Sequence, residues 1–401
     1  MDGTVRTGSQ ILSRKGSVGD RPKMRIGKTT RAGRLAAVLL VIIFAVLPPF
    51  NAHGALVPII YLPILKSETK IRIMAVGDNL YHDRVIRSGM KSDGTIDYRP
   101  IYSHIKDYLS NADIRIVNQE VILTPDSSKW KGYPDFASPY EVGDALVDAG
   151  FNVVTHATNH SWDNGKSGAQ YTVDYWKTQK DVLMTGMYGT AHDYQMLTIG
   201  EYNGIKVAFL NYTYGLNGPD KPAGGEYMFK LLDMSLVKKE IERAKKLADV
   251  VIVLPHWGKE YKFEANDDQK EMAKEMAELG ADLIIGCHPH VIEPLEFIET
   301  SDGRSVPCYY SLGNFVSNMM QPERCIEAMA DVTISVSDGK VTVESARAIP
   351  LVNYINKDCT KYAVYLFDDY TDKIAKTHES PMLTRNYVKM MWRKVFGEEI
   401  A

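Results

Sequence analysis

An apolar run at residues 71–76, Ile-Arg-Ile-Met-Ala-Val, ends in Gly77 and Asp78, and the same pattern returns along the chain. Further short apolar runs that end in polar residues lie at 113–117, 152–155, 250–254 and 282–285. Between these runs, residues with helical periodicity lie at 140–149, 236–248 and 267–279. Gly150 and Gly280 fit the position that follows a helix C-terminus. The alternation of strands and helices predicts an α/β fold.

Candidate metal ligands follow five of the predicted strands. They are Asp78, Asn118, Glu120, Asn159, His256, His288 and His290, with His160 next to Asn159. In α/β sheets, ligands bind where the carboxyl ends of strands meet. Histidines gather in the same places, because six of the ten lie at or near a predicted strand end: His82, His156, His160, His256, His288 and His290. A solvated surface or a random core would not cluster them so.

Each motif taken alone also has a structural explanation. A helix cap, a solvated loop, a turn or a packed ring would account singly for Asp78, Glu120, Asn159 and His256. The pair His288 and His290 is harder to explain in this way, since it follows a buried strand and points two imidazoles into one space. The joint pattern therefore favours a metal site.

The ligand types restrict the metal. Carboxylates, an asparagine carbonyl and imidazoles suit Mn²⁺, Fe²⁺ or Zn²⁺ better than Cu⁺ or an iron–sulfur cluster. Two divalent ions need roughly seven or eight protein ligands, a number that the candidate set nearly reaches. The cysteines have no CxxC spacing, so each is expected to be reduced and buried, although a bridge between Cys308 and Cys325 stays open.

The charge is divided between two parts of the chain. Residues 1–34 carry nine Lys and Arg against two acids, a net charge of +7, and the remaining 367 residues carry −10. This net negative charge of the main part of the chain argues against a nucleic-acid partner. Residues 35–65 hold no Lys, Arg, Asp or Glu, and Ala52-His53-Gly54 resembles a cleavage site. We expect a basic cytoplasmic arm at 1–34, a signal-anchor or signal peptide at 35–65, and a body outside the cytoplasm.

The C-terminal residues carry no chemical motif. They predict a strand at 362–367 and a closing helix at 386–397 with an apolar stripe, which is typical of core packing. The predicted domains after the membrane segment are therefore a main domain at 66–355 and a C-terminal strand and helix extension at 356–401.

Six motifs in this order resemble the bacterial capsule synthesis protein family CapA, also called the poly-γ-glutamate biosynthesis (PgsA-like) family. The motifs lie at 75–83, 118–120, 157–165, 256–261, 286–291 and 310–315. The resemblance covers residues 71–320 and the strands to about 355. That family is similar in fold to the calcineurin-like metallophosphoesterases. The resemblance implies a metallophosphatase-like, four-layer β-sandwich flanked by helices and preceded by an N-terminal membrane segment.

The resemblance also implies roles. Asp78 and His290 would bind a first metal, Glu120 would bridge, and the second metal would be held by Asn159, His256 and His288. His160 would be the catalytic residue that protonates the leaving group. Further candidates are His82, Asn118 and Asn314, of which Asn314 would touch substrate. Two features depart from the phosphoesterase pattern: His82 lies four rather than two residues after Asp78, and Glu120 replaces an aspartate.

The implied function is that of a cell-envelope protein of capsule or poly-γ-glutamate biosynthesis with a dinuclear metal site. Its partners would be capsule or polyglutamate synthesis membrane proteins and an anionic polymer or phosphorylated substrate. The expected location is a single-pass membrane anchor with an extracytoplasmic catalytic domain, or secretion after signal cleavage. Two alternatives are an exported metal-dependent phosphoesterase unrelated to capsule and a non-hydrolytic binding component of a polymer synthesis or export complex.

Overall fold

The computed structural model describes residues 69–218 and 223–400. They belong to a compact unit that runs from Ile64 to Ala401. The predicted basic arm at 1–34 and membrane segment at 35–65 lie outside the described residues. Among the helices of the described part, none is long and apolar enough to cross a membrane.

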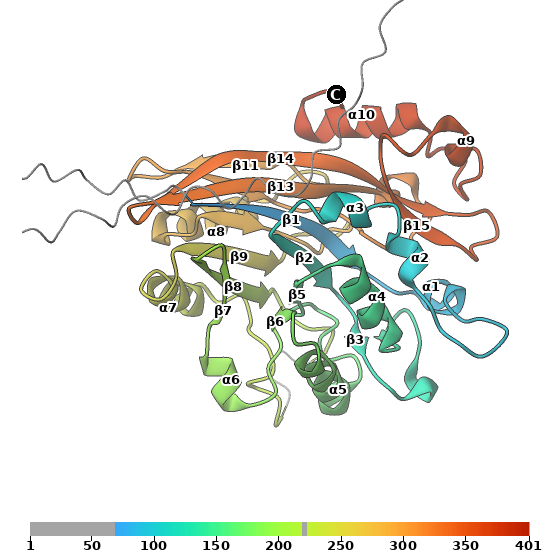
Figure 1. Cartoon of the computed structure of the whole chain (residues 1–401), viewed down its shortest axis with the longest axis horizontal. Helices are drawn as coiled ribbons and strands as arrows, with labels where there is room; N and C mark the ends of the chain where they lie inside the picture. Colours follow the sequence, from blue (N-terminus) through green and yellow to red (C-terminus); the bar gives the residue numbers. More distant parts are fainter. Residues whose placement is uncertain (1–68, 219–222, 401) are drawn as a thin grey trace, which may run out of the picture. The chain divides into compact units, whose positions relative to one another are not determined.

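Two mixed β-sheets form the centre of this unit (Figure 1). The first has the strand order β15-β14-β13-β1-β2-β5-β6 and the second the order β11-β12-β10-β9-β8-β7. The first sheet consists of β1 (Thr69–Asn79), β2 (Ile114–Gln119), β5 (Val153–Thr155), β6 (Leu183–Thr185), β13 (Ile326–Ser337), β14 (Lys340–Ile355) and β15 (Tyr362–Leu366). The second consists of β7 (Thr198–Tyr202), β8 (Ile205–Thr213), β9 (Val250–His256), β10 (Leu283–Ile285), β11 (Leu295–Glu299) and β12 (Ser305–Tyr309).

Each sheet has a parallel centre. Strands β1, β2, β5 and β6 run parallel in the first sheet, and β8, β9, β10 and β12 run parallel in the second. Antiparallel strands complete the edges, such as β13, which pairs with β1, and β7, which pairs with β8. A separate pair is formed by β3 (Ile122–Leu123) and β4 (Ala137–Ser138). The predicted α/β class is confirmed.

Helices connect the strands. They are α1 (Asp83–Ser88), α2 (Arg99–Tyr102), α3 (Lys106–Leu109), α4 (Glu141–Ala149), α5 (Gly165–Thr178), α6 (Ala191–Gln195), α7 (Met234–Ala244), α8 (Asp267–Leu279), α9 (Asp372–Ala375) and α10 (Arg385–Phe396), with 3₁₀ turns η1 (Ser127–Lys129) and η2 (Pro322–Cys325). Gly150 and Gly280 end α4 and α8 in the left-handed conformation, as predicted. The predicted helix at 236–248 ends earlier, at Ala244.

Alternating side chains of the second sheet face two different cores. Phe209 and Ile252 belong to the main core, together with Ile73 and Ile116 of the first sheet, so the two sheets pack face to face. The alternate residues of β8, β9 and β10 pack instead with buried side chains of α7 and α8. The strand residues are Ala208, Leu210, Val251, Val253 and Ile284, and the helix residues are Val237, Ile241, Ala273 and Met276. The sandwich is therefore covered by helices on this side.

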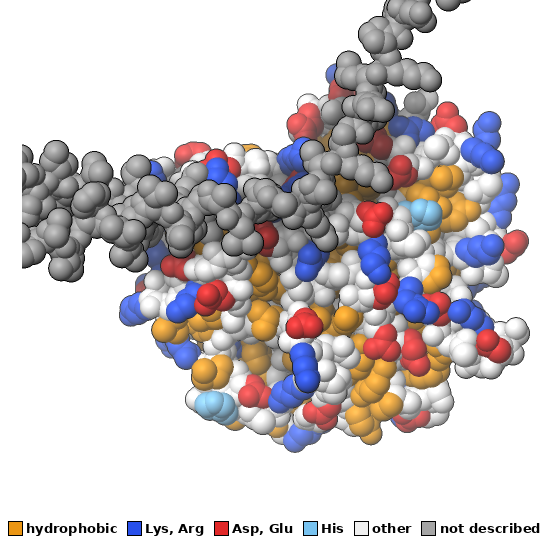
Figure 2. All heavy atoms as spheres, viewed as in Figure 1, with side chains coloured by type: hydrophobic (Ala, Val, Ile, Leu, Met, Phe, Trp, Pro, Cys, Tyr) orange, Lys and Arg blue, Asp and Glu red, His pale blue; other side chains and the backbone are white. Residues whose placement is uncertain are grey.

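The C-terminal residues pack into the main core. Strand β15 and helix α10 form close to the predicted positions, and the apolar stripe of α10 is buried at Val388, Met391, Trp392 and Val395. All four cysteines are free and buried, so no bridge joins Cys308 to Cys325. On the face shown in Figure 2, basic and acidic side chains are intermixed rather than gathered by sign.

Close backbone packing fixes the end of β1. A Cβ atom on Gly77 would lie 1.9 Å from the carbonyl oxygen of Gly313, a backbone atom that also accepts a 2.9 Å hydrogen bond from the Asp78 amide. We expect Gly77→Ala to lower the free energy of unfolding by about 1–3 kcal/mol or more, because overpacking displaces backbone here. Chemical denaturation measures the loss. Gly189→Ala is the matched control, since its Cβ would meet only side-chain atoms. Equal midpoints for the two variants would contradict the close approach.

Candidate metal centre

The first candidate ligands stand at the carboxyl ends of β1 and β2. The pairing register of β1 with β2 shifts between Val76 and Asp78. This irregularity turns the Asp78 carboxylate out of the regular alternation of the strand. Its Oδ1 accepts a 2.7 Å hydrogen bond from Asn118 Nδ2, and its Oδ2 accepts one of 3.2 Å from the His288 amide. Asp78 caps no helix, because the next helix, α1, begins at Asp83.

The second sheet supplies the imidazoles. His256 is the last residue of β9, and His288 and His290 lie in the loop that follows β10. Both loop histidines have positive φ, 107° and 59°, a conformation that costs a residue with a side chain on the order of 1–3 kcal/mol and concentrates at functional sites. The rings of His256 and His288 are 4.9 Å apart, and those of His288 and His290 are 5.9 Å apart.

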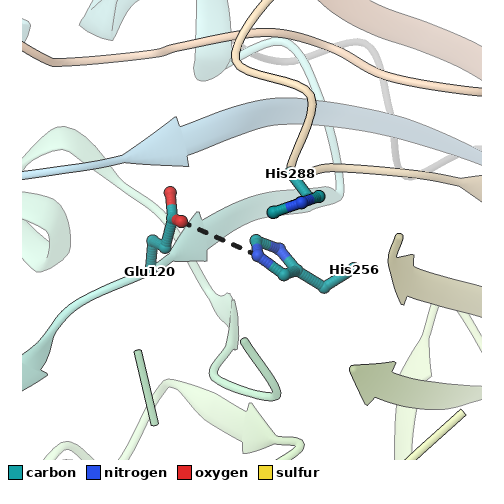
Figure 3. A group of neighbouring side chains, drawn as sticks. All are labelled: Glu120, His256 and His288. Carbon is teal, nitrogen blue, oxygen red and sulfur yellow. Dashed lines mark ion pairs between the residues drawn. The ribbon is translucent and has the colours of Figure 1, made fainter. Parts of the chain in front are cut away.

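Glu120 lies close to the histidines of the second sheet. Its Oε1 is 3.6 Å from His256 Nε2 and 3.8 Å from His290 Nε2. Figure 3 shows the carboxylate of Glu120 pointing toward His256, with the His288 ring beside it. Neither carboxylate oxygen of Glu120 has a hydrogen-bond partner among the described residues, and neither does His288 Nδ1. Buried polar atoms are normally paired, so these free atoms fit a site that binds a cation.

Two groups of ligand atoms share Glu120. One contains Asp78, Glu120 and His290, and the other contains Glu120, His256 and His288; within each group the atoms lie within 4.8 Å of one another. Asn159 joins the second group, because its Oδ1 is 2.8 Å from His256 Nε2. The structure thus brings together all six residues that the family resemblance implies as metal ligands.

The electrostatics of the cluster also suit cations. Burial raises the pKa of Glu120 well above its usual value, and the nearby Asp78 adds to the shift. Burial lowers the pKa of His256 and brings that of His288 to about 4, so both rings are neutral and offer a lone pair. Burial opposes the charged form of His290 as well, but Glu120 and Asp78 outweigh it and raise that pKa to about 9. Without a cation the cluster thus favours a protonated Glu120 and a charged His290, and a bound divalent cation would shift both toward the unprotonated forms that bind metal.

A further carboxylate lies at the exposed side of the cluster. Glu260 forms a third group of ligand atoms with His288 and His290, again within 4.8 Å. The sequence motif at 256–261 contains Glu260, yet nothing in its spacing distinguished this residue from an ordinary surface acid. The structure adds it as a candidate ligand.

His160 lies beside the cluster on the loop after β5. Its Nδ1 is 2.6 Å from Asp163 Oδ2, which also accepts a hydrogen bond from the Phe136 amide. Burial raises the pKa of Asp163, and the bond to His160 opposes that shift. Asn217 Nδ2 lies 3.3 Å from His160 Nδ1, and the Asn217 amide donates to the Asn159 carbonyl. Asn217 was missed from the sequence, since only the fold brings it to His160, and Asp163 lies inside the motif at 157–165 but was not singled out.

The remaining candidates support the cluster from outside. Asn118 orients Asp78 while its own Oδ1 accepts a 2.7 Å hydrogen bond from Thr155. His82 contacts the Leu80 carbonyl and the Asn318 amide, both at 3.3 Å, and it belongs to none of the three ligand groups of the described residues. His156 is a satisfied core histidine whose Nε2 accepts from the Trp176 indole.

Asn314 binds the protein rather than facing open space. It is fully buried, its Oδ1 lies 3.0 Å from His290 Nδ1, and its Nδ2 donates to the His290 carbonyl at 3.2 Å. The same Nδ2 also lies 3.2 Å from the Arg324 carbonyl. These contacts orient the His290 ring.

A buried carboxyl farther along this loop gives the stability of the protein a pH dependence. Glu293 accepts a 2.8 Å hydrogen bond from Gln269, its other oxygen is unpaired, and burial raises its pKa to about 8. Between pH 4.5 and 8 the folded state keeps a proton that the unfolded state has lost, so stability falls as the pH rises through this window. We expect Glu293→Gln to reduce that slope, with unfolding free energies measured by denaturation at pH 5 and 8. The exposed Glu299→Gln is the control, and an unchanged slope in Glu293→Gln would contradict the prediction.

Curated relatives share part of this chain. It is 36% identical over 173 residues to the "PGA biosynthesis protein CapA" of Bacillus subtilis (strain 168), which covers 43% of this chain and 44% of that protein. It is 29% identical over 259 residues to the "Capsule biosynthesis protein CapA" of Bacillus anthracis, which covers 63% of this chain and 61% of that one. The chain thus spans less than two thirds of the length of either relative.

Solved structures show a weaker likeness. A phosphatase from Mycoplasma pneumoniae has a TM-score of 0.45 at 17% identity, covering 71% of this chain and 95% of that one. The calcineurin-like phosphoesterase YfkN from Bacillus subtilis has a TM-score of 0.42 at 14% identity, covering 82% and 97%.

A family match spans the whole candidate centre. The sequence profile of the bacterial capsule synthesis protein PGA_cap matches residues 72–319, which include every ligand of the three groups, His160 and Asn314. The match covers more than half of the chain and confirms the resemblance seen in the six motifs. This chain belongs to the bacterial capsule synthesis protein (PGA_cap) family.

Proposed function

We propose that this chain is a cell-envelope protein of capsule or poly-γ-glutamate biosynthesis that uses a dinuclear divalent metal site for hydrolysis. One observation carries the proposal: two ligand groups share Glu120, whose buried carboxylate oxygens have no other partner among the described residues. The printed names of both curated relatives support the biosynthetic context.

The ligands divide between two metal positions. Asp78, Glu120 and His290 would hold one ion, and Glu120, Asn159, His256 and His288 the other. Oxygen and imidazole ligands without a thiolate favour Mn²⁺, Fe²⁺ or Zn²⁺. Such a pair of ions supplies Lewis-acid activation and a nucleophile at neutral pH for hydrolysis of a phosphate-type ester. The two-sheet sandwich would then be of the metallophosphoesterase type.

The chain's own residues would handle the proton. His160 is held through Nδ1 by Asp163, so its ring has a fixed orientation and its Nε2 can deliver a proton to a leaving oxygen. Phe136 packs edge-on against the ring, with centroids 4.6 Å apart, and limits water around it. Asn314 and Asn118 keep a histidine and a carboxylate ligand in position.

The charge division supports a location in the envelope. A +7 segment followed by 31 residues without Lys, Arg, Asp or Glu is typical of a cytoplasmic flank and a membrane segment. We propose a single-pass anchor with the metal site outside the cytoplasm, secretion after cleavage being the alternative. Partners would be membrane proteins of polymer synthesis, and the substrate an anionic polymer or a phosphorylated intermediate.

A non-hydrolytic binding component is the second candidate. Its support is Glu120, whose side chain is one methylene longer than the aspartate of active phosphoesterases and would alter the bridge.

Metal analysis of the full-length chain separates the candidates. We expect about two divalent ions per chain, together with hydrolysis of generic phosphate monoesters or diesters that chelation abolishes and Mn²⁺ restores. Two bound ions without hydrolysis of any ester would support the binding component. A purified chain that binds no divalent ion at micromolar concentrations would refute both metal-dependent candidates.

A further inference from the structure

An arginine that pairs with no carboxylate in the described part of the chain lies close to the metal centre. The guanidinium carbon of Arg324, in η2, lies 3.6 Å from the ring centroid of Tyr261. Its Nε is buried and has no hydrogen-bond partner among the described residues. Arg72 and Arg347 behave differently, because both pair with Asp331. Arg324 is therefore a partly buried cation that stacks on Tyr261, and this contact uses none of its N–H groups.

Both members of this pair are tied to the loop that carries the ligand histidines. Tyr261 adopts a φ of 64°, and its amide donates a 2.7 Å hydrogen bond to the Pro289 carbonyl, between His288 and His290. Its ring lies 6.1 Å from the His290 ring. Arg324 is connected through Asn314, whose side chain bonds to the carbonyls of both Arg324 and His290. The backbone of Arg324 is thus tied to the ligand loop through Asn314, and its guanidinium is held against Tyr261.

Tyr261 lies at the edge of the cluster. It is 37% exposed, so this edge is open to solvent. A substrate that reaches the metal ligands would pass a cation here.

Guanidinium chemistry indicates what such a substrate carries. A guanidinium stacked on an aromatic face keeps its edge free for in-plane hydrogen bonds, and its planar fork matches a carboxylate or phosphate bidentately. Stacking also lowers the entropy lost on binding, because the side chain is already ordered. The enclosed Nε is not reachable from solvent, so a substrate oxyanion would meet the Nη groups of this partly buried side chain.

We propose that Arg324 and Tyr261 form a subsite for an oxyanion of the substrate, a carboxylate or phosphate group next to the group that reacts at the metal centre. The proposal rests on the proposed function for the identity of that reacting group. It assigns Arg324 to substrate binding and not to metal binding.

Equilibrium binding to the full-length chain tests the subsite with two probes, an oligomer of γ-linked glutamate and an oligomer of glycerol phosphate. We expect Arg324→Gln to weaken binding of at least one probe by about tenfold or more, and Arg324→Lys to recover only part, since lysine lacks the fork. If only the glutamate oligomer binds more weakly, the subsite binds a carboxylate. If only the glycerol phosphate oligomer binds more weakly, the subsite binds a phosphate. The control is Arg99→Gln, which removes the same charge from an exposed arginine paired with Asp97.

Metal content, measured on the same samples, keeps the two proposals apart. Arg324→Gln should retain the metal content of the wild type, and its loss would assign Arg324 a structural role and overturn the subsite. Unchanged affinity for both probes, or a wild type that binds neither, would also overturn it. If the wild type contains no metal and Arg324→Gln still binds a probe more weakly than the wild type does, the subsite is supported and the dinuclear centre is refuted.

Discussion

Asp78→Asn is expected to lower the affinity for divalent metal more than about 100-fold and to abolish hydrolysis within detection, because even residues that only orient ligands cost 10–100-fold. The substitution is nearly isosteric, and its oxygen can still accept the hydrogen bond from Asn118. What it removes is one of the two negative charges in the group formed with Glu120 and His290. An effect on metal content therefore reports charge and coordination rather than shape.

The measurement is the number of ions retained per chain after dialysis against a fixed free Mn²⁺ concentration. Asp331→Asn is the matched control, since Asp331 is also a buried carboxylate but pairs with Arg72 and Arg347 on the first sheet. We expect the control to lose stability and keep its metal. If Asp78→Asn retained both ions, Asp78 would not be a ligand.

Stability of the metal-free protein gives an independent readout. Asp78 contributes to the raised pKa of Glu120, so two carboxylates repel each other in a buried space when no cation is bound. Asp78→Asn relieves that repulsion but also removes the carboxylate that lies 3.2 Å from His290 Nδ1, so the metal-free variant and the metal-free wild type should unfold at similar denaturant concentrations. With saturating Mn²⁺ the wild type should become the more stable of the two, because only the wild type gains binding free energy.

The sequence located the strands that carry the site, because each apolar run forms part of a strand. The run at 71–76 lies within β1, which continues to Asn79, and the run at 250–254 lies within β9, which continues to His256. Parallel strands deliver their following residues to one edge of a sheet, so Asp78 and Glu120 could be grouped without coordinates. Glycine at the ends of α4 and α8 marked helix termini for the same local reason.

Pairing between strands could not be predicted in the same way. Periodicity gives no indication that β2 and β9 belong to different sheets, although Glu120 and His256 meet only because the two sheets face each other. Helix α5 was not predicted, and it begins after Asn164 without a side-chain capping hydrogen bond. Long-range packing decides such elements, and local pattern does not.

The supporting residues were the hardest to find. Asn217 follows His160 by 57 positions and lies in a segment typical of a turn. Arg324 and Tyr261 are far apart in the sequence, and both are connected by hydrogen bonds to the loop after β10. Asp163 was visible inside a motif, but its role depends on the 2.6 Å contact with His160. Chemical identity alone does not separate these residues from ordinary surface polar groups.

His160→Ala is expected to lower kcat by about 10²–10⁴-fold on an alkyl phosphate ester while leaving metal content unchanged, since His160 belongs to none of the ligand groups of the described residues. The physical reason is proton delivery. An alkoxide is a poor leaving group unless it is protonated as the bond breaks, and His160 is the oriented imidazole beside the cluster. Asp163→Asn should also lower kcat, because a neutral amide replaces the carboxylate that holds His160 Nδ1.

The dependence on the leaving group distinguishes proton delivery from a structural role. A nitrophenolate leaves without protonation at neutral pH, so His160→Ala should lose much less activity on a nitrophenyl ester than on the alkyl ester. His378→Gln is the matched control, because His378 is also buried but bonds to Ser380 and Asn353 and not to residues beside the metal ligands. Equal losses on both esters would mean that His160 holds the site in shape and transfers no proton.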